Sequence, residues 1–266
     1  MPPEFYPEEL TDQSRRVLDR VVAAAPDAIL IGGWATWVRA AGPMSHDIDM
    51  IVSHDDLDAL RGHVDDLSTS TNVGGQKWRA TLQGIHLDLY VPYQSRLGTV
   101  LQLRVEDLTA HREQVDRWSV LTVPAHTATK IAAVLDRPDT MPGQKDRVEI
   151  LSLLPNTTPG EILDVIAASS ERDLDDLRGE LTDRLFEYLG ETDGLGKKER
   201  HALSVDRRTW DSEITQIVGP PPVSPAQISA VLPSKADDGT ATGRVRPYDK
   251  ADGTRVKGHP RRRKGR

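Results

Sequence analysis

Two aspartates lie two residues apart in an apolar segment of this 266-residue chain. Asp47 and Asp49 alternate with Ile48 and Met50, which predicts a β-strand over residues 47–52. Because side chains two residues apart point to the same face of a strand, both carboxylates share one face. Burying a carboxylate without a counter-charge is costly. The pair therefore predicts a divalent cation with oxygen ligands, such as Mg²⁺; an edge strand with two solvated acids is the alternative.

A third carboxylate is expected beside this pair. Residues 77–91 alternate around Gly84 as a β-hairpin does, and Asp88 is the lone acid of the second strand. We expect that strand to pair near residues 47–52, whereas an outward-facing, solvated Asp88 is the alternative. Three carboxylates on neighbouring strands are the ligands of a two-metal site, which takes Mg²⁺ or Mn²⁺.

A pair of glycines precedes these acids. Residues 28–31 predict a buried strand, and Gly32 and Gly33 follow it at the start of a predicted helix. Backbone N–H groups at such a helix start bind phosphate. With the acids, this arrangement predicts in-line attack of a hydroxyl on the α-phosphate of a nucleoside triphosphate, with pyrophosphate leaving. The sequence contains no Walker A motif or dinucleotide-binding fingerprint.

The elements around these residues predict an α/β (α+β) fold, in which a mixed sheet with flanking helices precedes a helical region. Strands are expected at residues 28–31, 47–52, 77–83, 85–91, 100–105 and 118–123, the last two as a pair. Helices are expected at residues 8–25, 34–41, 126–135, 144–154, 162–168, 174–189 and 205–218, with one more after Ser53. We therefore divide the chain into an α/β domain that carries the three acids (1–123), a helical domain contributing to the active site (124–218), and a Pro-rich linker with a basic tail (219–266).

The composition restricts the class of protein. The chain has no cysteine, which excludes a disulfide framework, a cysteine zinc site and a thiol nucleophile. No apolar run approaches the roughly 20 residues of a membrane helix, so we expect a cytoplasmic protein without a membrane partner. Residues 244–266 carry a net charge of +8, which leaves −15 on the rest because the whole chain carries −7. Such a tail is predicted to be disordered unless bound, and it serves either nucleic-acid binding or solubility.

These motifs resemble a known superfamily. Gly32-Gly33, Asp47-Ile-Asp49 and Asp88 are similar to the signature of the DNA polymerase β-type nucleotidyltransferases. The resemblance implies that the glycines bind the nucleotide and that Asp47 and Asp49 are metal ligands. It also implies that Asp88 coordinates the catalytic metal and helps to deprotonate the attacking hydroxyl.

The second half resembles one branch of that superfamily, the nucleotidyltransferase-like toxins of type IV toxin–antitoxin systems (the AbiEii and MenT group). These proteins have a helical lysine followed by a Lys-Asp-x-x-Asp-like run, and here Lys130 precedes Lys145-Asp146-Arg-Val-Glu149. By this resemblance, which covers residues 28–155, Lys130 neutralises the triphosphate and Asp146 positions Lys130 or the acceptor.

The chain departs from the family pattern at two positions. The family usually has Gly-Ser where this chain has Gly32-Gly33, and a final Asp where it has Glu149. The missing hydroxyl argues against control by phosphorylation at that position. Ser45 is expected to act as a loop hydrogen-bonding residue rather than as a substitute for this hydroxyl.

The resemblance implies an NTP-dependent nucleotidyltransferase that modifies RNA, in characterised members the tRNA 3′ end, and thereby blocks translation as a toxin. A cognate antitoxin protein is the expected partner. One alternative is transfer to a small molecule, as aminoglycoside nucleotidyltransferases perform it, or to a protein side chain. Another is a non-catalytic nucleic-acid-binding module that keeps the fold.

Overall fold

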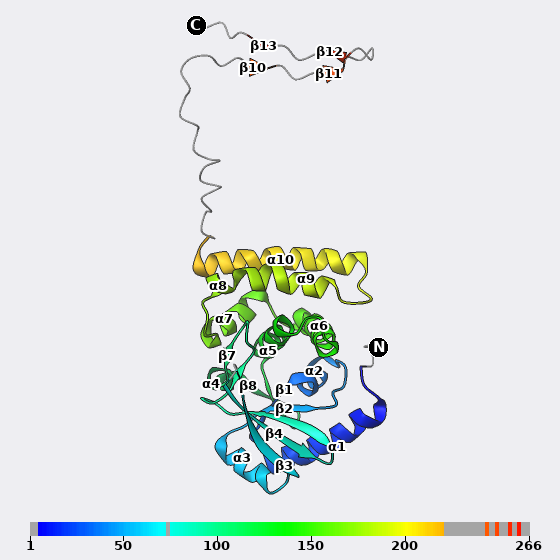
Figure 1. Cartoon of the computed structure of the whole chain (residues 1–266), viewed down its shortest axis with the longest axis vertical. Helices are drawn as coiled ribbons and strands as arrows, with labels where there is room; N and C mark the ends of the chain where they lie inside the picture. Colours follow the sequence, from blue (N-terminus) through cyan, green and yellow to red (C-terminus); the bar gives the residue numbers. More distant parts are fainter. Residues whose placement is uncertain are drawn as a thin grey trace. The chain divides into compact units, whose positions relative to one another are not determined.

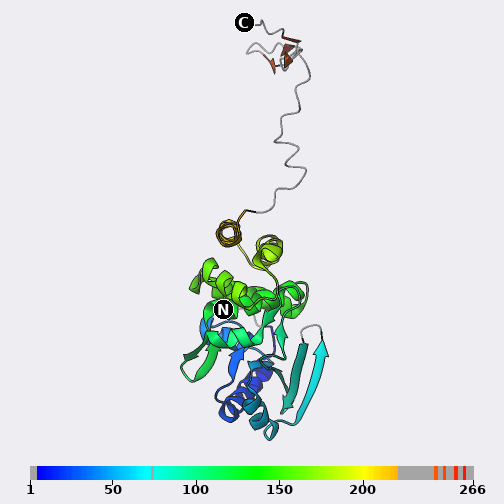
Figure 2. The same ribbon diagram turned by 90° about the vertical axis from the view of Figure 1, so that its left-hand side faces the viewer.

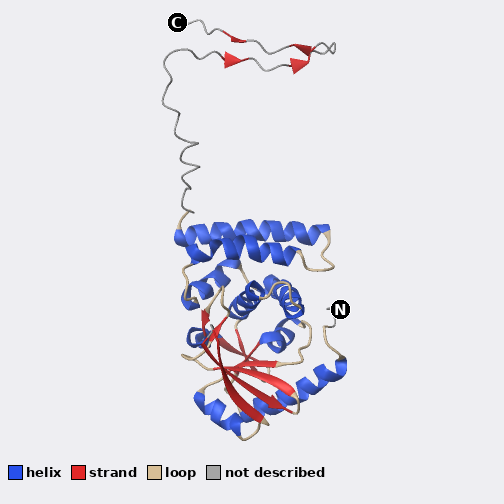
Figure 3. Cartoon of the chain, in the orientation of Figure 1, coloured by secondary structure: helices blue, strands red, loops and turns tan. Residues whose placement is uncertain are grey.

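The computed structural model describes residues 5–72 and 75–220, together with four two-residue strands in the region after residue 220. Residues 1–220 and 221–266 form two compact units. In the first unit a mixed sheet with flanking helices is followed by a helical region (Figures 1 and 3). This architecture confirms the predicted α/β class.

The first five elements follow the predicted order. They are α1 (Glu8–Ala24), β1 (Ile29–Ile31), α2 (Gly32–Ala40), β2 (Ile48–Ile51) and α3 (His54–Arg61). Helix α2 begins at Gly32, so the glycine pair is its first turn rather than a separate turn. The predicted helix after Ser53 is confirmed, and Ser53 caps it: the Asp56 N–H donates to Ser53 Oγ at 3.0 Å, and the Ser53 N–H donates to the Asp56 carboxylate at 3.0 Å. This reciprocal pair is a capping box.

Three consecutive strands follow, namely β3 (Asp66–Asn72), β4 (Gly75–Leu82) and β5 (Ile85–Tyr90). The predicted hairpin of β4 and β5 is confirmed, and its turn residues Gln83 and Gly84 have φ values of +53° and +77°. Strand β3 was not predicted. It lies at the edge of the sheet, and its sequence is polar except for Leu67, so it lacks the apolar alternation that marks a half-buried strand.

The predicted pairing of residues 100–105 with residues 118–123 is wrong. The strands in this region are β6 (Arg96–Leu97), β7 (Leu103–Arg104), β8 (Arg112–Val115) and β9 (Trp118–Leu121), with helix α4 (Val105–Leu108) and a 3-10 turn (Thr109–His111) between β7 and β8. Strand β9 pairs with β8 and β1, whereas β7 pairs with β6 and forms a single bridge from Leu103 to Ser170. The apolar residues Leu101, Leu103 and Val105 are buried in the core with the C-terminal helices instead. Alternation shows that a segment is half-buried but does not show its partner.

The main sheet has the strand order β3-β4-β5-β2-β1-β9-β8 in the described chain. Strand β2 is parallel to β5, and β1 is parallel to β9. The remaining neighbours are antiparallel. This order places β2, which contains Asp49 and directly follows Asp47, at the centre of the sheet.

The C-terminal half of the first unit is helical. Its helices are α5 (Val123–Asp136), α6 (Met141–Leu153), α7 (Pro159–Ser169), α8 (Leu174–Gly179), α9 (Leu185–Gly190) and α10 (Lys197–Val218), with a 3-10 turn (Leu154–Asn156) after α6. The predicted helix 174–189 is confirmed but contains a π-helical segment, Glu180–Arg184, between α8 and α9. Helix α10 begins at Lys197 rather than near residue 205, because a mostly polar helix that buries only Leu203, Trp210 and Ile214 has a weak periodic signal. Among the described helices, none is both long and apolar enough to cross a membrane.

Two apolar cores lie on the two faces of the sheet. On one face, helices α1 and α3 pack with Ile48, Met50, Leu87 and Leu89. On the other, Ile29, Ile31 and Ile51 pack with helices α5 to α10. Since Asp49 alternates with Ile48 and Met50, its side chain lies on the face that the C-terminal helices cover. The boundary at residue 123 stays a prediction.

In the second unit, β10 (Gly243–Arg244) pairs with β13 (Pro260–Arg261), and β11 (Tyr248–Asp249) pairs with β12 (Arg255–Val256), both antiparallel. The predicted Pro-rich linker and the rest of the basic tail lie outside the described residues.

Candidate active site

Asp49 and Asp88 lie directly opposite each other in the sheet. Strands β2 and β5 are parallel and in a register that pairs these two residues. Asp47 precedes β2 by one residue and shares the face of Asp49, because side chains alternate along a strand. The structure therefore brings the three predicted acids to adjacent positions on one face.

The first turn of α2 lies against Asp49. Gly32 has a φ of +68°, and a Cβ added there would lie 2.8 Å from Cγ of Asp49. Only glycine fits this backbone conformation and this close approach. The first N–H groups of a helix have no partner within the helix, so this turn offers hydrogen-bond donors beside the acids.

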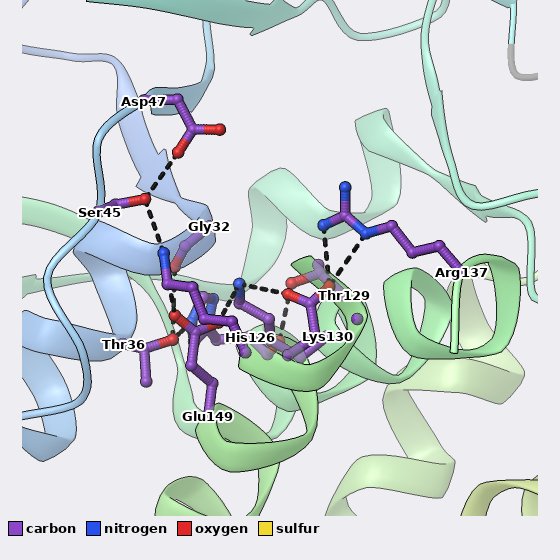
Figure 4. Close-up of polar contacts among 12 residues, drawn as sticks. Gly32, Thr36, Ser45, Asp47, His126, Thr129, Lys130, Arg137 and Glu149 are labelled. Carbon is purple, nitrogen blue, oxygen red and sulfur yellow. Dashed lines mark hydrogen bonds and ion pairs between the residues drawn. The ribbon is translucent and has the colours of Figure 1, made fainter. Parts of the chain in front are cut away.

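Gly33 makes room for a second polar group, because a Cβ added there would lie 2.8 Å from the Ser45 hydroxyl oxygen. That hydroxyl donates to Asp47 Oδ1 at 2.6 Å and accepts from Lys145 Nζ at 2.8 Å (Figure 4). Ser45 and Lys145 are both buried. Ser45 is thus the loop hydrogen-bonding residue that we predicted, and its contacts orient the Asp47 carboxylate.

Helices α5 and α6 bring a group of paired charges to the same place. Lys130 Nζ lies 3.0 Å from Asp146 Oδ1 and also contacts Glu149. The other oxygen of Asp146 accepts hydrogen bonds from Arg137 Nε (3.1 Å) and Nη2 (2.8 Å). Burial acts to lower the pKa of Lys130, but Glu149 and Asp146 raise it above its usual value, so Lys130 stays charged. Asp146 therefore holds two cations, of which Arg137, with a side chain 48% exposed, reaches solvent (Figure 4).

A buried histidine joins α5 to α2. His126 Nε2 on α5 lies 2.8 Å from Thr36 Oγ1 on α2, and the same hydroxyl lies 3.4 Å from the carbonyl oxygen of Gly32 (Figure 4). Burial holds the pKa of His126 well below its usual value, so the ring is neutral at physiological pH. The contact couples the helix that carries Lys130 to the helix that starts at Gly32.

The negative charge of the acids is only partly balanced. Burial, followed by the charges of Asp47 and Asp88, raises the pKa of Asp49 to about 7. Burial also acts to raise the pKa of Asp47, but the hydrogen bond from Ser45 and nearby cationic groups hold it below its usual value. Neighbouring hydrogen-bond donors and cations thus stabilise the ionised carboxylate of Asp49 less than that of Asp47.

Asp47, Asp49 and Asp88 supply the oxygen ligands that a divalent cation takes, but their side chains do not converge. In the part of the chain that the structure describes, no three Asp, Glu or His side chains converge as the ligands of a ready-made metal site do. Asp88 instead contacts the Lys77 ammonium group and lies 3.7 Å from Arg79 Nε. The donor set still fits Mg²⁺, because the three carboxylates supply hard oxygen atoms, and a cation between them would offset the burial and the mutual repulsion that raise the pKa of Asp49.

Two tyrosines border the acids. The Tyr6 ring lies 4.0 Å from the His46 ring and 5.2 Å from Lys145 Nζ. The Tyr90 ring lies 5.3 Å from Lys77 Nζ. Burial, and then the charge of Asp47, raises the pKa of Tyr6 to about 12, so its phenol stays protonated and able to donate.

Sequence reasoning missed several of these residues. Tyr6 precedes the first predicted helix, and Arg137 lies in the turn after α5, so neither belongs to a periodic pattern. Lys77 lies on the same strand face as Arg79, but only the register of β4 on β5 places both cations beside Asp88. Lys145 was visible in the motif with Asp146, although its contact with Ser45 depends on the tertiary fold.

Solved structures with similar folds include two proteins described as nucleotidyltransferases or as similar to them. A putative nucleotidyltransferase (TM1012) from Thermotoga maritima is 15% identical, with a TM-score of 0.34 over 42% of this chain and 78% of that chain. An antigenic nucleotidyltransferase-like protein from Paracoccidioides brasiliensis is 14% identical, with a TM-score of 0.38 over 76% of this chain and 93% of that chain. JHP933 from Helicobacter pylori is 12% identical, with a TM-score of 0.40 over 79% and 95% of the two chains.

No protein-family model matches the sequence, and no curated protein matches it.

Proposed function

We propose that this chain is a metal-dependent nucleotidyltransferase that transfers a nucleotide from an NTP to an RNA acceptor. The observation that carries the proposal is the register that places Asp49 opposite Asp88, with Asp47 on the same face and Gly32 packed against Asp49. Carboxylates for a metal and free N–H groups for a phosphate meet there.

Asp47, Asp49 and Asp88 would hold Mg²⁺, or Mn²⁺ in its place. When bound, the metal neutralises charge on the reacting phosphate and activates the attacking hydroxyl. The N–H groups of the first turn of α2 and the ammonium group of Lys130 bind the triphosphate. Asp146 positions Lys130.

The reaction is an in-line displacement at the α-phosphorus. The acceptor hydroxyl oxygen forms a new bond to phosphorus, and the bond from phosphorus to the bridging oxygen of the leaving group breaks. Pyrophosphate departs with the electron pair of that bond, and the hydroxyl proton passes to the Asp88 carboxylate. Since Asp88 contacts Lys77 in the structure, that contact has to open before Asp88 takes the proton.

The distribution of charge favours an RNA acceptor. Residues 244–266 carry +8, and a segment of this charge binds phosphodiester backbones. We take the 3′ end of tRNA as the acceptor. A nucleotide added there prevents aminoacylation, which would make the protein a translation-blocking toxin with an antitoxin protein as its partner.

The test is a transfer assay with magnesium, each α-labelled NTP in turn and total tRNA. We expect label on tRNA with the wild type and none with Asp49→Ala. Asp58→Ala is the matched control, because the Asp58 side chain is 76% exposed on α3, on the other face of the sheet. Transfer of label to a small molecule or a protein instead would favour the alternative acceptors, and no transfer from any NTP would contradict the proposal.

A further inference from the structure

The face of the sheet that carries the acids is only partly covered by helices. Over β1 and β2 this face packs against the C-terminal helices. Over β3, β4 and β5 the same face presents exposed polar side chains, including Ser68, Arg79 and His86. The opposite face of β4 and β5 is packed against α1 and α3. Figure 2 shows the β3–β4 hairpin, in cyan to teal at the right of the first unit, with no helix on its outer side.

A row of paired residues leads from the acids onto this open face. Asp49 pairs with Asp88, Asp88 pairs with Arg79, and Arg79 pairs with Ser68. In the neighbouring row, Lys77 pairs with Ser70. Side chains paired in this way are close neighbours on one face. Arg79 and Ser68 are therefore one and two strands away from Asp88.

The open face carries two cations next to the acids, although residues 1–243 together carry −15 and Asp66 lies on the same face, two residues along β3 from Ser68. Lys77 and Arg79 both approach Asp88, and their side chains are 16% and 59% exposed. Ser68 and Ser70 add hydroxyl donors farther out. These groups donate hydrogen bonds and attract anions, and phosphate oxygens accept from both ammonium and hydroxyl groups.

The cations near the acids thus form two separate groups. Lys130 and Arg137 are held by Asp146 on the helical side, where the first turn of α2 also lies. Lys77 and Arg79 belong to β4, on the strand side. In the proposed function the helical group serves the triphosphate, which leaves the strand group for the acceptor once its contacts with Asp88 open. A small acceptor at Asp88 would not reach as far as Ser68, two strands away, whereas a polymer would.

We propose that the open strand face, defined by Ser68, Ser70, Lys77 and Arg79, binds the phosphodiester backbone of an RNA acceptor whose terminal hydroxyl reaches Asp88. This inference rests on the proposed function and assigns a binding surface to its acceptor. Lys77 and Arg79 pair with phosphates, and the two serines donate hydrogen bonds. Such contacts position an RNA strand without reading its sequence.

Binding of labelled total tRNA to the full-length chain, measured at several salt concentrations without NTP, tests this surface. Arg79→Gln should weaken binding about fivefold and reduce the slope of log affinity against log salt by roughly 0.7 to 0.9. Ser68→Lys should tighten binding and steepen the slope. Arg112→Gln is the matched control, because Arg112 is also an exposed strand arginine paired with an aspartate, Asp27 at 3.1 Å, but lies on β8 at the other edge of the sheet.

Steady-state kinetics separates this inference from the proposed function. We expect Arg79→Gln to raise the KM for tRNA and to leave the KM for NTP unchanged. If the wild type labels tRNA but Arg79→Gln and Ser68→Lys bind and react as the wild type does, the open strand face is not the acceptor surface and the proposed function stands. If the wild type labels a protein or a small molecule and not tRNA, both the surface and the RNA acceptor are contradicted.

Discussion

Asp49 on β2 pairs in register with Asp88 on the parallel strand β5, and both carboxylates lie on the face of the sheet that meets α5 and α6. Two like charges in adjacent strands, both half-buried, are costly unless a cation joins them. In the protein without a metal, this cost raises the pKa of Asp49. The predictions below follow from this relationship and from the contacts that surround it.

Asp49→Asn should make the metal-free protein more stable at alkaline pH. The pKa of Asp49 is about 7 in the folded chain against a model-compound value of 3.8. The free energy of unfolding therefore falls as pH rises from about 4 to 7, and above 7 the full penalty, on the order of 1–4 kcal/mol, is present. Urea midpoints at pH 5 and pH 8 measure this difference. If the urea midpoints of the wild type and of Asp49→Asn change equally between pH 5 and pH 8, the raised pKa does not belong to Asp49.

Gly32→Ala should cost more stability than Gly84→Ala. Both glycines have positive φ, +68° and +77°, but a Cβ at Gly32 would meet Asp49, whereas one at Gly84 would have no contact within 4 Å. We expect a loss of about 1 kcal/mol at Gly84 from backbone strain alone, and of roughly 3 kcal/mol at Gly32. Urea unfolding gives both values. Gly32→Ala should also abolish NTP binding, and an intact affinity for NTP would show that the first turn of α2 does not hold the phosphates.

Asp146→Asn should raise the KM for NTP by about tenfold, because Lys130 and Arg137 lose the carboxylate that both contact. The loss of a buried ion partner should also reduce stability by roughly 3 kcal/mol. Asp107→Asn, which removes a half-exposed partner of Arg104, should cost under about 1 kcal/mol. A large loss of stability with an unchanged KM would assign Asp146 a structural role only.

Thr36→Val should loosen the connection between α2 and α5. The substitution keeps the volume and removes the hydroxyl that His126 contacts at 2.8 Å, which leaves a buried imidazole nitrogen unpaired at a cost of about 1–3 kcal/mol. Since the start of α2 would then be less well held against Lys130, the KM for NTP should rise as well. Thr36→Ser, which retains the hydroxyl, should restore the KM, and failure of this rescue would contradict the positioning role of the hydroxyl.

The central part of the site could be predicted from the sequence because its signals are local. Asp47 and Asp49 stand out inside an apolar strand, and Gly32 stands out between a strand and a helix. Apolar periodicity likewise predicted most helices and the β4–β5 hairpin. These features depend on residues that are neighbours in the sequence, so they can be recognised without knowledge of the fold.

The remaining features depend on contacts between distant segments. Strand β3 is a polar edge strand, and the partner of β9 is the polar strand β8 rather than the apolar residues 100–105. Arg137 enters the site only because α5 and α6 pack side by side, and Lys77 only through the register of β4 on β5. The local sequence does not predict which distant segments pack together or in which register two strands pair.

Pyrophosphate release coupled to nucleotide incorporation tests the central claim most directly. Purified wild type, Asp49→Asn and the control Asp58→Asn would be incubated with magnesium, the four NTPs and total RNA, and released pyrophosphate and incorporated nucleotide would be counted together. We predict one pyrophosphate per nucleotide incorporated for wild type and control, with a loss of at least about 1,000-fold for Asp49→Asn. Release of inorganic phosphate and NDP instead, or equal pyrophosphate release by Asp49→Asn, would contradict nucleotidyl transfer at these three aspartates.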